Sequence, residues 1–239
     1  MSDKLFIIIP AYNEEETIEE VVKEWHQVVA GIGEQSRLVV INDGSKDHTK
    51  EKLEDLMKEY PQLTAITKPN SGHGGTVLYG YHYALEQGAD YIFQTDSDGQ
   101  TLASEFGPFW EQRRSYDVLI GHRNHREDGA SRVFVTKVLK YVLLCIFHLK
   151  ITDANTPYRL MSRKVLEKHI DKVPENFNLS NVMLTVLFTD AKEKMLYMPI
   201  TFRPRQGGVN SINFKKITKI GIQAVKDFRR IKKELKKNR

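Results

Sequence analysis

The chain has 239 residues, of which 40% are hydrophobic, which predicts one large domain with a full core, or a domain and a half. Its net charge is +5, but residues 215–239 hold eleven Lys and Arg against two acids, so residues 1–214 carry about −4. The excess positive charge therefore lies in the tail, which argues against a basic nucleic-acid groove, and we expect no nucleic-acid partner.

The sequence shows no pattern for export or for a membrane span. The N-terminus leads directly into an apolar run and has no signal-peptide pattern. The longest apolar run, residues 141–147, is far shorter than the roughly 20 residues that a span requires. The single cysteine, Cys145, lies among apolar neighbours, and we interpret it as a packed core thiol in a reducing compartment. These features predict a cytoplasmic protein.

The first hundred residues alternate predicted strands and helices. Apolar runs predict buried strands at residues 5–9, 37–41, 63–67 and 91–95. Asn13 and three glutamates predict the start of a helix that reaches residue 29, because acids suit a helix N-terminus. Further helices are predicted at residues 50–60 and from the 70–75 loop to residue 87. The repeated units predict an α/β fold, with a mostly parallel, doubly wound sheet flanked by helices.

Polar clusters follow three of these strands. They are Pro10-Ala11-Tyr12-Asn13-Glu14 after the first strand, Asn42-Asp43-Gly44-Ser45 after the second, and Asp96 and Asp98 after the fourth. In doubly wound sheets the ligand lies beyond the carboxyl ends of the strands, near the topological switch point. Three clusters at one edge of the sheet therefore predict a nucleotide or phosphate site.

Asp96 and Asp98 are one residue apart at the end of a predicted strand. In extended backbone their side chains point to the same side, where two carboxylates repel each other unless a cation neutralises them. Hard ions such as Mg²⁺ take oxygen ligands and keep positions open for water or phosphate. The pair predicts a metal held against a phosphorylated substrate. The alternative is a solvated turn, which Asp, Ser and Gly also favour.

The second half is less regular. Residues 132–149 predict a largely apolar helix, residues 182–188 are another apolar stretch, and residues 195–202 predict a strand. Pro157 interrupts any helix in the polar segment between them. Because no repeat or low-complexity linker is present, we predict a catalytic domain at residues 1–213 and a tail at residues 214–239.

The tail has the pattern of a basic amphipathic C-terminal helix. Its apolar residues recur at helical spacing: Phe214, Ile217, Ile220, Val225, Phe228, Ile231 and Leu235. Such a helix can lie in the interface of an anionic membrane. The alternative is that its first half packs on the catalytic domain while its last dozen residues are solvated. Residues 132–149 could supply a second apolar surface toward the bilayer, although core packing is the commoner fate of such a stretch.

The three polar clusters occur in a fixed order and are followed by Asn70-x-Gly72, Gly121-His122-Arg123 and Arg205-x-Gly207-Gly208. In these motifs, over roughly residues 4–214, the chain resembles the family-2 glycosyltransferases of the Rossmann-like GT-A fold, which use nucleotide-sugar donors. The spacing is most similar to the branch of dolichyl- and undecaprenyl-phosphate sugar transferases. The resemblance implies single displacement with inversion at the anomeric carbon.

The resemblance also implies how the donor is bound. Pro10, Ala11, Tyr12 and Glu14 would line the base and ribose pocket, and Asp43 would read the base. Asp96 and Asp98 match the motif that holds the metal and the diphosphate, and Gln100 matches a glutamine that follows it in the lipid-phosphate branch. The implied ligands are a UDP- or GDP-sugar and Mg²⁺ or Mn²⁺, the metal being held by Asp96, Asp98 and Gln100.

Further basic and acidic positions match the acceptor side of the family. Arg123, Arg126 and Arg132 match positions that hold acceptor or donor phosphate, and Arg205 matches a segment that closes over the donor. Asp153 and Arg159, with Asp98, match catalytic positions. A hydroxyl acceptor needs a general base, whereas an ionised phosphate acceptor mainly needs positioning. Asp153 would be the base in the first case and would orient Arg159 or the sugar in the second.

Two departures leave the acceptor open. Asn42 stands where relatives often carry Asp, and Asn155-Thr156-Pro157-Tyr158-Arg159 replaces Ser-Gly-Phe-Arg or Cys-Gly-x-Arg. We expect an inverting, metal-dependent glycosyltransferase acting on a polyprenyl phosphate, peripherally at the inner face of the membrane. The alternative acceptor is a glycan hydroxyl in polysaccharide synthesis.

Other classes of protein fit less well. A nucleotidyltransferase should carry a glycine-rich, basic signature near the first strand, which residues 10–14 lack. A membrane-surface adaptor that retains only the fold need not keep Asp96, Asp98 and Asp153. Single residues also have structural interpretations: Glu14 at a helix N-terminus, Arg159 and Arg205 in surface ion pairs, and His73 as a loop residue.

Overall fold

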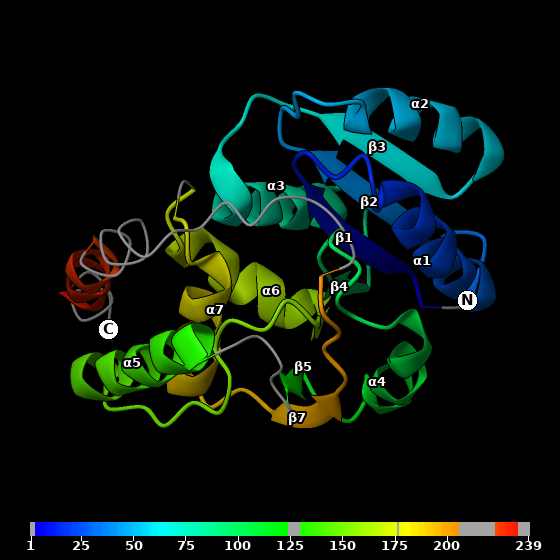
Figure 1. Ribbon diagram of the computed structural model, residues 1–239. Helices are drawn as coiled ribbons and strands as arrows, with labels where there is room; N and C mark the ends of the chain where they lie inside the picture. Colours follow the sequence, from blue (N-terminus) through cyan, green and yellow to red (C-terminus); the bar gives the residue numbers. More distant parts are fainter. Residues whose placement is uncertain (1–2, 124–129, 176, 206–222, 234–239) are drawn as a thin grey trace.

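A computed structural model of the chain describes residues 3–123, 130–175, 177–205 and 223–233 (Figure 1). Its sheet has seven strands in the order β3-β2-β1-β4-β6-β5-β7. The strands are β1 (Leu5–Ala11), β2 (Arg37–Asn42), β3 (Leu63–Thr67), β4 (Tyr91–Gln94), β5 (Val118–Arg123), β6 (Arg159–Ser162) and β7 (Met195–Ile200). Only β6 runs antiparallel to its neighbours, β4 and β5. The prediction of a mostly parallel α/β sheet is confirmed.

Helices cover both faces of the sheet (Figure 1). They are α1 (Ile18–Ile32), α2 (Thr49–Glu59), α3 (Gly72–Glu86), α4 (Phe106–Gln112), α5 (Ala130–Phe147), α6 (Arg163–His169) and α7 (Ser180–Asp190), with short 3-10 turns at Ala103–Glu105 and Ile170–Lys172. Phe6 and Ile8 of β1 pack with α3 and α7, whereas Ile7 and Ile9 pack with α1 and α2. Burial on both faces explains why these strands are apolar throughout rather than alternating.

The first helix begins later than its sequence predicts. Asn13 adopts a left-handed backbone conformation, with φ of 54°, and α1 starts only at Ile18. The glutamates that were expected to open the helix therefore lie in the preceding loop. Asparagine tolerates this conformation better than most residues, so its presence at the strand end signals a turn instead of a helix N-cap.

Four elements of the second half have no clear sequence pattern: β5, β6, α4 and α6. The apolar stretch at residues 182–188 is the buried helix α7, and the strand expected at residues 195–202 is β7. Short strands such as β6, with four residues, offer no periodicity that separates them from a loop.

Within the tail, residues 223–233 are helical and pack on the domain through Phe228 and Ile231, both buried. The ring of Phe228 lies 5.9 Å from that of Phe147 and 5.8 Å from that of Phe177. Residues 206–222 and 234–239 lie outside the described residues, so the full C-terminal helix and the domain division at residue 213 stay predictions. Phe228 and Ile231 belong to the last dozen residues, which the alternative left solvated, so for residues 228–233 that part of the alternative is wrong.

One prediction about α5 is wrong: Cys145 is exposed and is no core thiol. It lies on the outer face of α5, whereas Leu143 of the same helix is buried. The apolar neighbours in sequence suggested burial, but a helix on the surface has two faces, and here both carry apolar side chains. Of the helices in the described residues, none is long and apolar enough to cross a bilayer.

Candidate active site

The carboxyl ends of β1, β2 and β4 bring the predicted polar clusters to one edge of the sheet. Ala11 at the end of β1 pairs with Asn42 at the end of β2, and Ile8 of β1 pairs with Gln94 of β4. The backbone N–H of Asp43 donates to the Ala11 carbonyl at 2.9 Å, and the N–H of Thr95 donates to the Ile8 carbonyl at 3.2 Å. Pro10 and Ala11 are buried in β1, while the side chain of Tyr12 at the edge is exposed.

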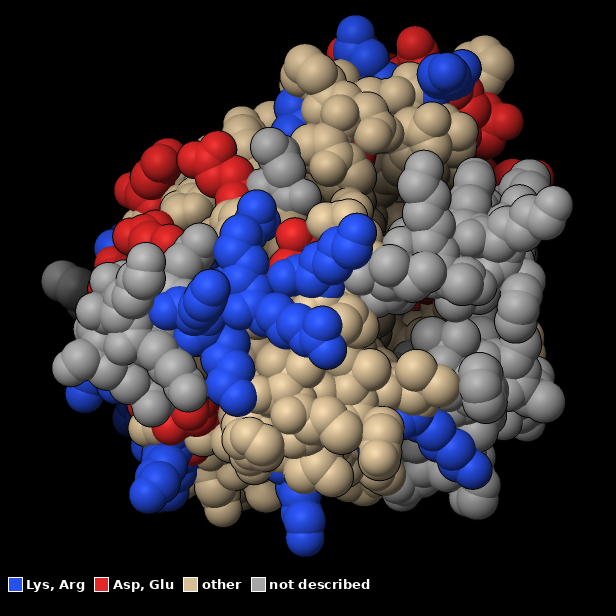
Figure 2. Space-filling model, turned by 90° about the vertical axis from the view of Figure 1, so that its left-hand side faces the viewer, with Lys and Arg blue, Asp and Glu red and all other residues tan. Residues whose placement is uncertain are grey.

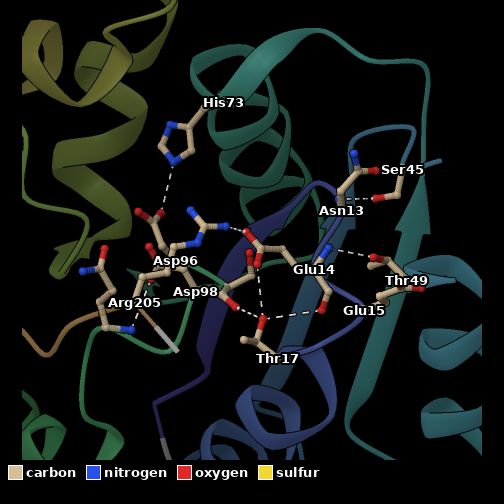
Figure 3. A network of polar contacts seen from close by, with 12 residues as sticks. Asn13, Glu14, Glu15, Thr17, Ser45, Thr49, His73, Asp96, Asp98 and Arg205 are labelled. Atoms are coloured by element: carbon tan, nitrogen blue, oxygen red, sulfur yellow. Dashed lines mark hydrogen bonds and ion pairs between the residues drawn. The ribbon is translucent and has the colours of Figure 1, made fainter. Parts of the chain in front are cut away.

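Hydrogen bonds join the loop after β1 to the loop after β2 (Figure 3). The N–H of Asn13 donates to Ser45 Oγ at 2.9 Å, and the N–H of Glu14 donates to Thr49 Oγ1 at 2.9 Å. In return, Asn13 Oδ1 accepts from the N–H of Lys46 at 2.8 Å. The left-handed turn at Asn13 is therefore held from the neighbouring loop, which fixes where Glu14 lies.

Asn42 has a structural role that an aspartate would fill differently. Its Oδ1 accepts from the N–H and the hydroxyl of Ser45, at 3.1 and 2.5 Å, and its Nδ2 donates to Thr67 Oγ1 at 3.2 Å. The amide thus ties the ends of β2 and β3 together through both a donor and an acceptor. A carboxylate accepts only, so the asparagine removes a charge from the edge without losing these partners.

Asp43 is a buried carboxylate held by the start of α3. Its two oxygens accept from the N–H groups of Ser71 and Gly72, at 2.8 and 2.9 Å, and Lys68 forms an ion pair with it. Burial opposes its charge, but Lys68 and these N–H donors outweigh burial and hold the pKa of Asp43 below its usual value. Lys68, which follows β3, was not predicted, although it obeys the same rule of polar residues beyond strand ends.

Glu14 and Arg205 form an ion pair at 2.6 Å between groups 191 residues apart in sequence (Figure 3). Thr17 Oγ1 lies 3.2 Å from Glu14 Oε2 and donates to the Ser97 carbonyl at 2.9 Å. Burial raises the pKa of Glu14 to about 7, with Arg205 opposing the shift and Asp98 adding to it. Glu14 therefore couples the loop after β1 to the Asp96–Asp98 turn and to the segment after β7.

Asp96 and Asp98 lie in the turn after β4, on the same side of the site as Arg205 (Figure 3). His73 Nε2, from the first turn of α3, lies 3.0 Å from Asp96 Oδ1. Asp98 Oδ1 accepts from the N–H of Gln100 at 3.2 Å. Gln100 is buried, and its Nε2 donates to the Arg203 carbonyl at 2.9 Å. Because the amide nitrogen of Gln100 donates to Arg203, the amide oxygen is the atom of Gln100 that could bind a metal ion.

The oxygen groups of this turn suit a hard divalent ion. Among the residues that the structure describes, no group of three or more His, Cys, Asp and Glu side chains forms a ready metal cage. Mg²⁺, however, is commonly held by one or two carboxylates together with waters and substrate phosphates, without an all-protein cage. Two half-exposed carboxylates and one amide oxygen match that ligand chemistry, so the residues present fit the predicted metal.

Arg159 is a fully buried residue of β6, placed opposite Gln94 of β4. Its guanidinium donates to the carbonyls of Ala154, Thr156 and Asn181 at 2.8–3.2 Å, and to Thr185 Oγ1 at 3.3 Å. These contacts hold the loop that carries Asp153, which is itself buried. In the described structure Arg159 is thus a positioning residue, and the alternative of a surface ion pair does not apply to it.

Three basic positions of the acceptor side are not described at the level of side chains. Arg126 lies outside the described residues, and Arg123 and Arg132 lie in β5 and α5 with side chains that are outside them too. Arg205 is described, but residues 206–222, which follow it, lie outside the described residues. The phosphate-binding roles of Arg123, Arg126 and Arg132 therefore stay predictions.

Comparison with known protein families gives a match over the residues that carry these motifs. The sequence profile of Glycosyl transferase family 2 matches residues 6–170, well over half of the chain. The chain belongs to glycosyl transferase family 2. The predicted resemblance is thereby confirmed, and the protein is a glycosyltransferase whose family profile covers the clusters after β1, β2 and β4 as well as Asp153 and Arg159.

Proteins similar to this chain include enzymes named for polyprenyl phosphates. A dolichyl-phosphate beta-glucosyltransferase of Trichomonas vaginalis is 27% identical over 176 residues, which are 67% of this chain and 53% of the relative. A polyprenol monophosphomannose synthase of Mycolicibacterium smegmatis is 25% identical over 221 residues, covering 89% of this chain and 82% of the relative. The chain thus spans about half the length of the first relative and most of the second.

Solved structures share the fold. Glucosyl-3-phosphoglycerate synthase of Mycobacterium tuberculosis, in complex with Mn²⁺, UDP and glucosyl-3-phosphoglycerate, matches with a TM-score of 0.66. The match covers 93% of this chain and 77% of the synthase at 14% identity. The GT-A-like architecture of this family-2 chain is therefore established, with Asp96, Asp98, Glu14 and Asp43 at the carboxyl edge of its sheet.

Proposed function

We propose that this glycosyltransferase moves a sugar from a nucleoside diphosphate donor to a polyprenyl phosphate, with inversion and with the help of Mg²⁺ or Mn²⁺. One observation carries the proposal: Asp96 and Asp98 share the carboxyl edge of the sheet with Asp43 and with the Glu14–Arg205 pair. The names of the relatives, dolichyl-phosphate glucosyltransferase and polyprenol monophosphomannose synthase, support a lipid-phosphate acceptor.

The donor nucleoside would lie over the loops after β1 and β2. Asp43 is held ionised by Lys68 and by two backbone donors, which fixes its orientation at the edge where the base would lie. Tyr12, exposed at the same edge, offers an aromatic face to that base. Pro10 and Ala11 form the buried floor beneath them.

The diphosphate would lie against the turn after β4. Asp96, Asp98 and Gln100 would hold the divalent ion, which supplies Lewis-acid stabilisation of the departing nucleoside diphosphate when bound. Arg205 adds a forked donor for phosphate oxygens. In the structure this guanidinium pairs with Glu14, which keeps it at the site before a phosphate arrives.

The acceptor would approach from the side of Asp153. A polyprenyl phosphate is already ionised near pH 7, so the protein needs to position it and has no proton to remove. Asp153 then orients the sugar or the acceptor, while Arg159 keeps its loop in place. With a glycan hydroxyl as acceptor, Asp153 would be the general base, and the pH dependence of turnover would reveal that group.

The test is release of the nucleoside diphosphate from a panel of UDP- and GDP-sugars, with Mg²⁺ or Mn²⁺ and with or without polyprenyl phosphate. We expect one donor to be turned over only when metal and lipid phosphate are both present. Asp98→Ala should lower turnover by about 10²–10³-fold, because it removes an anchor of the leaving diphosphate. Asp55→Ala, on the exposed face of α2, is the matched control.

Three outcomes would contradict the proposal. Turnover that is unchanged in Asp98→Ala would remove the metal role of that turn. Turnover that depends on a glycan and ignores polyprenyl phosphate would establish the alternative acceptor. A lack of turnover with every donor and acceptor would leave the fold without the proposed chemistry.

A further inference from the structure

Over residues 137–147 of α5, large apolar side chains are exposed between Lys137 and Lys140 and the end of the helix, where a surface helix is usually polar. Val138, Tyr141 and Leu144 are exposed by 45%, 69% and 39%, and Cys145 is exposed beside them. Spaced three and four residues apart, these side chains form one stripe along the helix. The opposite face of α5 is already occupied, because Leu143 is buried in the core and Ile146 and Phe147 pack against it.

A basic surface lies directly beside this stripe. The helix at residues 223–233 turns Phe228 and Ile231 inward, and Lys226, Arg229, Arg230 and Lys233 are exposed on its outer side. These eleven residues hold five Lys and Arg against one acid, Asp227. Figure 2 shows the blue side chains gathered on this side of the molecule, above a tan surface at the height that α5 has in Figure 1.

Direct contacts fix the two helices to one another. The Phe228 ring lies 5.9 Å from the Phe147 ring of α5, and Lys232 Nζ donates to the carbonyl of Ile146. Apolar and basic surfaces therefore form one continuous face, whose geometry is set by the folded domain. The apolar side of the helix at residues 223–233 is buried against the domain. The apolar part of the face therefore comes from α5.

The same face borders the active site through one segment. Phe177 lies 5.8 Å from Phe228. The Phe177 carbonyl also packs on Gly74 of α3, where a β-carbon would come within 2.1 Å of it. Gly74 follows His73, which contacts Asp96. A short path of packed groups therefore connects the face to the turn that would hold the diphosphate.

We propose that the α5 stripe and the basic helix together form a docking face for an anionic lipid bilayer, with the stripe entering the interface and the helix lying on the headgroups. Charge complementarity selects this partner: basic side chains are attracted to anionic headgroups, while an apolar stripe with a tyrosine suits the boundary of headgroups and acyl chains. The inference rests on the proposed lipid-phosphate acceptor and adds the surface that brings the enzyme to it.

Vesicle flotation of the full chain tests the face without donor, metal or acceptor. We expect binding to phosphatidylcholine vesicles that contain phosphatidylglycerol, weak binding to phosphatidylcholine alone, and loss of binding at high salt. Tyr141→Asp should weaken binding about tenfold, since it places a charge in the stripe. Met57→Asp makes the same kind of change at an exposed apolar residue of α2 and should bind like the wild type.

A charge-reversal variant tests the basic helix at residues 223–233 separately from the α5 stripe. Arg229→Glu/Arg230→Glu/Lys233→Glu should lower binding to anionic vesicles by at least about 100-fold, because each basic residue near the surface contributes roughly a factor of five. The control reverses three exposed lysines on α1, α2 and α6, Lys23, Lys58 and Lys164, so the change in net charge is equal. Circular dichroism of each variant checks that the fold is kept.

Three results would overturn the docking face. They are wild-type protein that does not float with anionic vesicles, equal losses in both charge-reversal variants, and a wild-type dimer that Tyr141→Asp dissociates. The last result would assign the stripe to a second copy of the chain. Turnover of polyprenyl phosphate dissolved in detergent is unaffected by these variants if only docking is lost, which separates failure of this inference from failure of the proposed function.

Discussion

The two halves of the active-site edge hold their polar residues in different ways. On the half where we propose that the donor binds (the donor half), the loops after β1 and β2 are joined by many small contacts, such as Asn13 with Ser45 and Glu14 with Thr49. On the half where we propose that the acceptor binds (the acceptor half), one buried side chain, Arg159, binds the carbonyls of the loop before β6 and of α7. A distributed set of contacts tolerates the loss of any member, whereas a single central residue does not.

The largest effect is expected from Arg159→Met. It would leave the carbonyls of Ala154, Thr156 and Asn181 buried without a donor, so the free energy of unfolding should fall by about 4 kcal/mol. Arg163→Met is the matched control, because Arg163 also donates to two carbonyls, of Leu85 and Ala89, but is partly exposed. It should lose about 1 kcal/mol. Urea denaturation measures both, and equal losses would contradict a central role for Arg159.

A pH-dependent effect is expected on the donor half. Because burial raises the pKa of Glu14 from 4.5 to about 7, the folded state binds a proton that the unfolded state releases. The free energy of unfolding should therefore fall as pH rises from about 4.5 to about 7, by up to about 3 kcal/mol. Glu14→Gln should remove this slope in urea titrations with a chelator present.

Glu20→Gln, at an exposed position of α1, controls for the loss of a carboxylate. A slope that persists unchanged in Glu14→Gln would show that the Arg205 pair keeps Glu14 ionised in the folded protein throughout this range. The donor half would then carry a fixed ion pair in place of a titrating group.

The smallest effect is expected from Ser45→Ala. Ser45 Oγ accepts from the N–H of Asn13 and donates to Asn42, so its loss should cost about 1 kcal/mol in urea denaturation. The other bonds between the two loops, including Glu14 N–H to Thr49, should persist. A loss as large as that of Arg159→Met would show that the donor half also depends on one residue.

The donor half was largely predictable from sequence. Apolar runs that end in polar clusters predicted the strands. Because the carboxyl ends of parallel strands meet at one edge, the sequence also predicted that Asp43, Asp96 and Asp98 lie together. Lys68 and His73 were missed as site residues. Lys68 follows a strand like the others, whereas the contact of His73 with Asp96 depends on the packing of α3 against residues 177–178.

The acceptor half could not be predicted in the same way. Arg159 binds backbone carbonyl groups, which every residue possesses. No pattern of side chains in the sequence can therefore predict its partners. Strand β6 has four residues and enters the sheet antiparallel, between β4 and β5, which both come earlier in the chain. The exposure of Cys145 on α5 was also not predicted, because its apolar neighbours in sequence favoured a place in the core.

The direction of β6 has a consequence for how such enzymes change. Because β6 runs opposite to β4, the start of β6 and the end of β4 meet at the same edge. The segment between α5 and β6, residues 148–158, therefore lies at the edge where we propose that the acceptor binds. If the proposed acceptor site is correct, its preference should change mainly through exposed positions of this segment such as Thr152 and Asn155, because Tyr158 is buried in the core.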